Sequence, residues 1–162
     1  VNLEDAKGSL PCIGFNFWVK KTYDSILWYG NCQKESYEDR KNGCRIGLKK
    51  EKIDNQYIPY LKPQENGNKT DLRSFEILDM DMEGIQMFSD NRFEASALPY
   101  TSHELENAPN IVSLPNSQSY VIGIYGKKSG VGGDDSWGAP VLEEYLVDAE
   151  KDKTFSVFMR IL

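Results

Sequence analysis

Apolar residues recur at every second position in three stretches of this chain, and that alternation most constrains its fold. In the first stretch Ile13, Phe15, Phe17 and Val19 are separated by single residues, and the same spacing returns at 93–98 and 155–161. Successive side chains of a β-strand point to opposite faces of its sheet. The spacing therefore predicts half-buried strands of an antiparallel sheet.

Shorter runs predict further strands at 25–29, 57–61, 74–78, 85–88, 120–125 and 144–147. One short helix is predicted near 101–107, because Thr101 and Glu104 have the spacing of a capping box and Pro109 ends the run. A chain of 162 residues suits one domain. We therefore predict an all-β antiparallel sandwich with that one helix, folded as a single domain over 1–162.

The acidic balance of the chain limits its partners. The formal net charge is −6, and the run at 49–52 is the one basic cluster. Because nucleic-acid binding needs a basic surface, we expect no nucleic-acid partner and interpret this run as solvated surface. No apolar run approaches the length of a membrane span, so we also expect no membrane partner.

The three cysteines, Cys12, Cys32 and Cys44, are odd in number, and no two of them have the close spacing of a zinc site. We expect reduced, partly buried thiols and no metal site. Asp79, Asp81 and Glu83 alternate just before Gly84, and we interpret them as the solvated end of a hairpin.

The stretch GVGGDDSWG, at 130–138, has the most distinctive composition. A phosphate-binding loop is disfavoured because two aspartates would repel the anion. A calcium loop needs ligands at alternate positions, whereas Asp134 and Asp135 are adjacent. A sugar-binding platform fits better, because glycines allow a tight loop and Trp137 offers an aromatic face.

The residues alone leave two roles open for parts of this loop. Asp134 and Asp135 could bind sugar hydroxyls or accept backbone N–H groups of the loop, and the second role is favoured. Trp137 taken alone is better explained as a core residue, since tryptophans are mostly well buried. No G-x-S-x-G motif occurs, and His103 is interpreted as a surface residue of the helix start, so no catalytic residue is assigned.

Five motifs occur in a fixed order along the chain: Trp28-Tyr29-Gly30, then 35–40 (ESYEDR), 57–60 (YIPY), 63–73 (PQENGNKTDLR) and 130–137 (GVGGDDSW). This series resembles the C-terminal small-chain domain of bacterial β-galactosidases of glycoside hydrolase family two. The resemblance runs from about Gly14 to the C-terminus.

The resemblance implies a supersandwich of the galactose-mutarotase type, with 1–162 as the later portion of the small-chain domain. The whole enzyme hydrolyses terminal β-D-galactosides such as lactose with retention of configuration. Its two catalytic glutamates and its magnesium site lie in an upstream barrel. We therefore expect no catalytic residue, cofactor or metal in this chain itself.

The resemblance also reverses the interpretation of Trp137, which then reaches the mouth of the active site and stacks on the sugar. Gly132, Gly133, Asp134, Asp135 and Ser136 would shape its loop. The implied partners are a carbohydrate, the remaining domains of the enzyme and further copies of it, in a bacterial cytoplasm or periplasm. The alternative function is a free-standing carbohydrate-binding module, which an acidic all-β chain with surface aromatics suits equally well.

Overall fold

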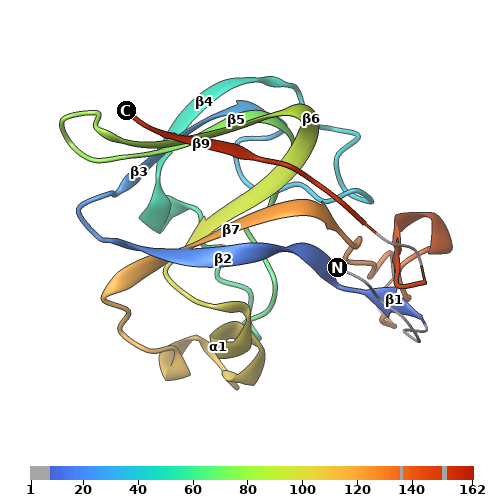
Figure 1. Cartoon of the computed structure of the whole chain (residues 1–162). Coiled ribbons are helices and arrows are strands. Elements are labelled where there is room, and N and C mark those ends of the chain that lie inside the picture. The colour runs from blue at the N-terminus through green and yellow to red at the C-terminus, as the bar shows by residue number, and fades with distance from the viewer. Residues whose placement is uncertain (1–7, 136, 151–152) are drawn as a thin grey trace.

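The computed structural model describes residues 8–135, 137–150 and 153–162 (Figure 1). Its strands are β1 (Ser9–Leu10), β2 (Cys12–Lys20), β3 (Ser25–Gly30), β4 (Gly47–Lys52), β5 (Lys69–Leu78), β6 (Gly84–Leu98), β7 (Ser119–Lys128), β8 (Val147–Asp148) and β9 (Phe158–Ile161). The helices are α1 (Ser102–Asn107) and three single 3₁₀ turns, η1 (Ile53–Asn55), η2 (Ile111–Ser113) and η3 (Glu143–Tyr145).

Seven of the strands form one antiparallel sheet. Its order is β2-β7-β6-β5-β3-β4, and β9 pairs with β6 outside that path. The short strands β1 and β8 pair separately as a two-stranded ribbon. The predicted all-β antiparallel fold class is therefore confirmed, and the alternating stretches at 13–19 and 93–98 lie in β2 and β6.

The long strand β6 runs through both parts of the sheet and lets the sheet fold so that the two parts face each other. Its start, Ile85–Phe88, pairs with both β5 and β9, whereas its end, Glu94–Leu98, pairs with β7. Figure 1 shows β2 and β7 crossing one side of the molecule while β3, β4, β5 and β9 lie on the other. Between the two sides lies one core, formed by Val19, Ile26, Trp28, Ile53, Leu72, Phe75, Ile77, Met87, Phe93, Ala95, Ala97, Tyr120, Ile122 and Ile124.

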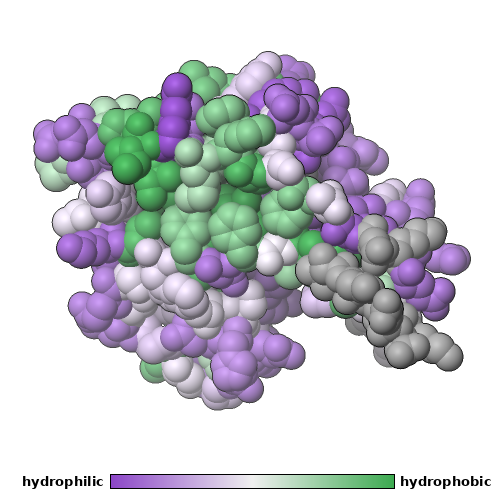
Figure 2. Space-filling model, in the orientation of Figure 1, coloured by the Kyte–Doolittle hydropathy of each residue, from purple (hydrophilic) through white to green (hydrophobic). Residues whose placement is uncertain are grey.

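An apolar surface lies over the gap between β9 and β2 in Figure 2, seen in the orientation of Figure 1. Phe15 of β2 stacks on Phe155 with ring centroids 6.5 Å apart, and Phe17 lies 6.3 Å from Phe15. Phe155 and Val157 also pack against the edge of the core. Apolar side chains of β2 and of the segment before β9 therefore cover this side of the sandwich and remain partly exposed on its surface.

The predicted helix is confirmed together with its cap. The Thr101 hydroxyl accepts a hydrogen bond from the Glu104 backbone N–H at 3.1 Å, and the Glu104 carboxylate accepts one from the Thr101 backbone N–H at 2.7 Å. The Asp79–Glu83 segment is the predicted hairpin end, in which Asp79 Oδ1 accepts backbone N–H groups of Asp81 and Glu83. No helix within the described residues is long and apolar enough to cross a membrane.

Two strand predictions need correction, and one strand was not predicted. Residues 57–61 form a loop rather than a strand, because Pro59 has no N–H to donate and the Ile58 N–H is taken by the Asn66 side chain. Of 144–147, Glu144 and Tyr145 belong to the turn η3, and only Val147 enters a strand. The edge strand β4 was not predicted, since its sequence GLKKEK lacks an apolar alternation; it pairs with β3.

The expectation of three reduced thiols is also wrong. Cys32 and Cys44 form a disulfide with Cα atoms 4.9 Å apart, and the bond closes the excursion between β3 and β4. Their pairing depends on the antiparallel return of the chain, which the spacing in sequence does not reveal. The remaining cysteine, Cys12, is a free thiol whose pKa is raised by burial.

Replacing both bonded cysteines by serine should lower the free energy of unfolding by about 3 kcal/mol, because a closed loop of this length restricts the unfolded chain. Urea denaturation of the Cys32→Ser/Cys44→Ser variant measures this loss, and Cys12→Ser is the matched control. An unfolding midpoint that does not respond to a reducing agent would contradict the prediction.

Lys69 should make the free energy of unfolding depend on pH, because its side chain is only 1% exposed. Burial lowers the pKa of its ammonium group from 10.5 to about 7, against the attraction of Glu35. Between pH 7 and 10 the unfolded chain therefore holds a proton that the folded chain lacks. The free energy of unfolding should rise with pH across this window, by up to about 1.4 kcal/mol per pH unit, and be unaffected by this group below it.

Urea titrations of the wild-type chain and of Lys69→Met at pH 7, 8 and 9 measure this contribution. The difference in stability between the two should change with pH. Parallel pH profiles for the two proteins would show that Lys69 keeps its proton in the fold.

Candidate functional site

The loop that follows β7 presents Trp137 to solvent, with the residue 92% exposed. The backbone N–H groups of Trp137 and Ala139 donate to Asp135 Oδ1 at 2.8 and 3.1 Å. Asp135 therefore fixes the turn that carries the indole. Asp134 is exposed beside it, and Ser136 lies outside the described residues.

The glycines of this loop have backbone conformations that other residues adopt with strain. Gly132, Gly133 and Gly138 have φ angles of +63°, +71° and +79°. The Gly133 N–H donates to the carbonyl of Ala139 at 2.9 Å, which closes the loop. A Cβ on Gly132 would also lie 2.8 Å from that same carbonyl oxygen, so the close approach requires a glycine.

A segment far away in sequence holds the start of the loop. Asp39 Oδ2 accepts the backbone N–H groups of Val131 and Gly132, each at 2.8 Å. Arg40 donates from its guanidinium to the Gly132 carbonyl. Neither residue was singled out from the sequence, although both lie within the motif at 35–40.

The predicted site residues that the structure describes thus lie together in one loop, with Gly132 buried and the others exposed. Trp137 is not a core residue, so the structure excludes the alternative that the residues alone favoured. His103 is exposed in the first turn of α1, where its carbonyl accepts from the Asn107 side chain at 2.8 Å. Sugar binding at Trp137 remains a prediction.

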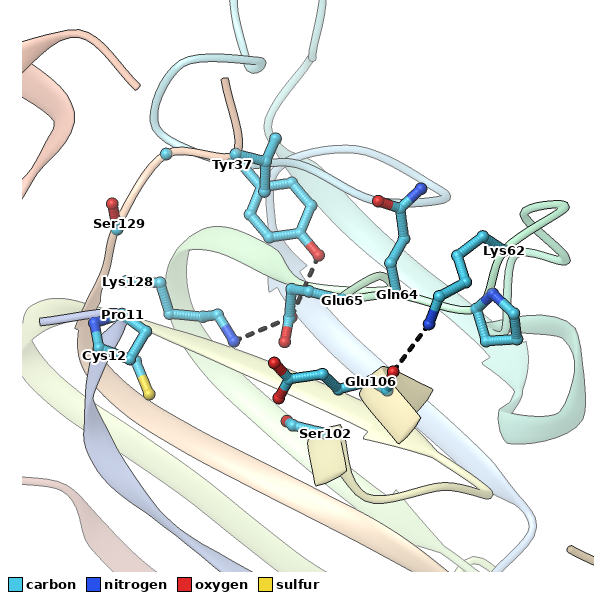
Figure 3. Close-up of a pocket in the computed structure, with 13 residues that line it drawn as sticks. Pro11, Cys12, Tyr37, Lys62, Gln64, Glu65, Ser102, Glu106, Lys128 and Ser129 are labelled. Atoms are coloured by element: carbon cyan, nitrogen blue, oxygen red, sulfur yellow. Dashed lines mark hydrogen bonds and ion pairs between the residues drawn. The ribbon is translucent and has the colours of Figure 1, made fainter. Parts of the chain in front are cut away.

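A pocket of about 670 Å³ adjoins the start of this loop, and sequence reasoning did not predict it (Figure 3). Its walls come from the loop at Ser129–Val131, the segment 62–65, the start of β2 and the helix α1. The Glu106 carboxylate of α1 points into the pocket, as Figure 3 shows. Motif residues Tyr37 and Glu65, which come from separate parts of the sequence, meet here.

The floor of the pocket is a charge pair whose lysine is buried and whose carboxylate is partly exposed. Glu65 Oε1 accepts from Lys128 Nζ at 2.9 Å and from the Tyr37 hydroxyl at 3.2 Å. The Lys128 side chain is only 6% exposed, and its ammonium lies 4.1 Å from the centre of the Tyr125 ring.

The protonation states of the pocket floor follow from these contacts. Burial acts to lower the pKa of Lys128, but Glu65 together with Tyr125 and Cys12 outweighs it and the net pKa is raised, so the amine stays charged at neutral pH. Burial, together with Glu65 and Glu35, strongly raises the pKa of Tyr37, which therefore remains a hydrogen-bond donor.

The chemistry that these residues can perform is binding. An exposed indole can stack on an apolar ring face, and the pocket offers carboxylates, an ammonium group and a phenol as hydrogen-bond partners. Within the described ranges, no group of three or more His, Cys, Asp or Glu side chains is placed to hold a metal ion.

Comparison with known proteins gives consistent matches. A family model described as beta galactosidase small chain matches residues 1–159. The chain is 40% identical over 147 residues to a beta-galactosidase of Halalkalibacterium halodurans and 39% identical over 145 residues to one of Priestia megaterium. A beta-galactosidase of Streptococcus thermophilus is 34% identical over 149 residues. Each match covers 90% of this chain, which spans only about 14% of the length of these relatives.

Replacing Glu65 by alanine should lower the free energy of unfolding by about 2 kcal/mol, because it leaves the buried Lys128 ammonium without its counter-charge. The partial exposure of Glu65 keeps this loss below that of a fully buried pair. Thermal or urea denaturation measures it. In a Lys128→Met background the same change should cost much less, and an equal cost in both backgrounds would contradict the pairing.

Proposed function

The chain belongs to the β-galactosidase small-chain family, and we propose that it is the C-terminal domain of an enzyme that hydrolyses terminal β-D-galactosides such as lactose. One observation carries the proposed role of the domain. Its loop motif presents Trp137 almost completely exposed, on a turn held by Asp135 and by the distant Asp39.

In this proposal Trp137 binds the sugar and does not take part in bond cleavage. A pyranose has one apolar face that can stack on an indole, and stacking contributes about 0.5–1.5 kcal/mol beyond simple burial. Retaining hydrolysis needs a carboxylate nucleophile and a carboxyl acid/base about 5–5.5 Å apart. We propose that this pair, and the magnesium ion, belong to the barrel of the same enzyme and not to this chain.

The proposed partners are a galactoside and the remaining domains of the enzyme, which assembles as a homo-oligomer. The apolar surface between β2 and β9 supports a domain partner, because exposed surfaces of this kind mark interaction sites. Of the two bacterial compartments proposed, the Cys32–Cys44 disulfide favours the periplasm, since disulfides persist in oxidising compartments.

A free-standing carbohydrate-binding module is the second candidate function, and the exposed Trp137, on a loop whose start lines a pocket, supports it equally. The two proposals differ in what precedes Val1. A barrel domain encoded upstream in the same reading frame supports the first, whereas a start codon or secretion signal directly upstream supports the second.

Replacing Trp137 by alanine in the complete enzyme should raise KM for lactose about tenfold while kcat changes less than twofold. This split is expected because stacking stabilises the bound substrate and the transition state alike. Steady-state kinetics with lactose and a chromogenic galactoside measure both constants.

Trp18 provides the matched control, because it is 60% exposed on β2 and lies outside the loop. Trp18→Ala should leave KM unchanged. A Trp137→Ala enzyme with the wild-type KM, or one whose loss falls entirely on kcat, would refute the proposed role.

A further inference from the structure

The short segment that carries Asp39 is anchored at Ser36, beside the beginning of β5. Ser36 and Asn68 are fully buried, and their backbones pair through a hydrogen bond from the Ser36 N–H to the Asn68 carbonyl at 2.9 Å. The Asn68 side chain returns a bond to the Ser36 carbonyl at 3.1 Å, and the Thr70 N–H donates to Ser36 Oγ at 3.0 Å. These buried hydrogen bonds hold the segment in one position, although Asn68 Oδ1 has no hydrogen-bond partner among the described residues.

Three residues after Ser36, at Asp39, the chain reaches the Trp137 loop. Asp39 lies 92 and 93 positions away in sequence from Val131 and Gly132, whose N–H groups its Oδ2 accepts. Arg40 donates to the carbonyl of the same Gly132. An anionic acceptor on successive N–H groups and a cationic donor on the neighbouring carbonyl fix the direction of a peptide as well as its position.

The loop provides room for the Asp39 carboxylate because Gly130 has no side chain. A Cβ on Gly130 would lie only 2.5 Å from Asp39 Oδ2, whereas one on Gly133 would make ordinary contact with Arg40 Nη2 at 3.4 Å. The second oxygen of Asp39, Oδ1, is buried without a hydrogen-bond partner among the described residues. Among the described residues, both hydrogen bonds that this carboxylate accepts therefore come from the loop.

The Cys32–Cys44 disulfide limits the freedom of the same segment. It joins the chain on both sides of 36–40, so the ends of the segment cannot separate. The buried network on one side and the disulfide on the other leave Asp39 and Arg40 few alternative positions.

We propose that Asp39 and Arg40 are positioning residues for Trp137, which set the affinity for the sugar without contacting it. They hold the turn at 130–133 in the one orientation from which the indole meets the substrate. The inference rests on the proposed sugar contact of Trp137. Releasing the turn lowers the fraction of molecules with a competent loop, and the apparent affinity falls by that fraction.

The test is a set of variants in the complete enzyme. Asp39→Ala should raise KM for lactose about fivefold with kcat within about twofold of the wild type, as expected when a fifth of the loops are competent. Asp39→Asn should have a smaller effect, about twofold, because its amide oxygen still accepts hydrogen bonds. The matched control is Glu38→Ala, which removes the neighbouring carboxylate that pairs with Lys41 at 2.7 Å. It should leave KM unchanged.

The double variant Asp39→Ala/Trp137→Ala separates this inference from the function on which it rests. If Asp39 acts through Trp137, the double variant has the KM of Trp137→Ala alone. Two results would overturn the positioning role only. The first is a double variant whose rise in KM is the product of the rises in the two single variants. The second is a wild-type KM for Asp39→Ala together with a raised KM for Trp137→Ala. A wild-type KM for Trp137→Ala would overturn the sugar contact itself.

Hydrogen exchange gives an independent readout of the loop. Peptides that contain Val131 and Gly132 should exchange faster in Asp39→Ala than in the wild type, while Trp137→Ala should leave them protected. Equal protection of these amides in wild type and Asp39→Ala would overturn the proposal.

Discussion

The fold depends on the hydrogen-bonded pairing of β6, a long strand shared by both halves of the sandwich. Its start pairs with β5 and β9, and its end pairs with β7. Because it is 15 residues long and bends, the sheet can fold over a single core without a second long connection. The same strand places Glu94 beneath the site, where the carboxylate accepts the Lys128 N–H at 2.9 Å and an amide proton of Asn68. The core and the loop region are therefore joined through β6.

The polar groups near the loop form a connected series rather than isolated contacts. Burial raises the pKa of Glu94 despite the hydrogen bonds from the Lys128 backbone and the Asn68 side chain. Asn68 also holds Ser36, which begins the segment that ends in Asp39 and Arg40. Buried polar networks of this kind specify one arrangement, because each unsatisfied member would be costly. The series extends from the sheet to the turn that carries Trp137 and gives an exposed residue a fixed base.

Much of the fold could be predicted because its signals are local. The alternation at 13–19 follows directly from the geometry of a strand, and Thr101 with Glu104 caps the helix within one turn. Contacts between distant segments have no such pattern. The bond from Val131 to Asp39 and the pairing of Cys32 with Cys44 both depend on how the chain returns after β3. The charged strand β4 was missed because its pairing with β3, and not its own hydrophobicity, makes it a strand.

At the site, the loop was predicted from its composition, whereas the pocket floor needed Glu65 and Lys128 to be brought together by the fold.

The three tryptophans of the chain occupy three different environments. Trp28 is fully buried and donates to the Asn31 carbonyl, Trp18 is partly exposed on an outer strand, and Trp137 is nearly free of protein contact. Their fluorescence therefore differs in emission wavelength and in access to a dissolved quencher. With Trp18 replaced, the red-shifted, quencher-sensitive emission reports the loop alone, while the blue-shifted emission reports the core. The intrinsic fluorescence of the protein thus reports separately on the core around Trp28 and on the loop that carries Trp137.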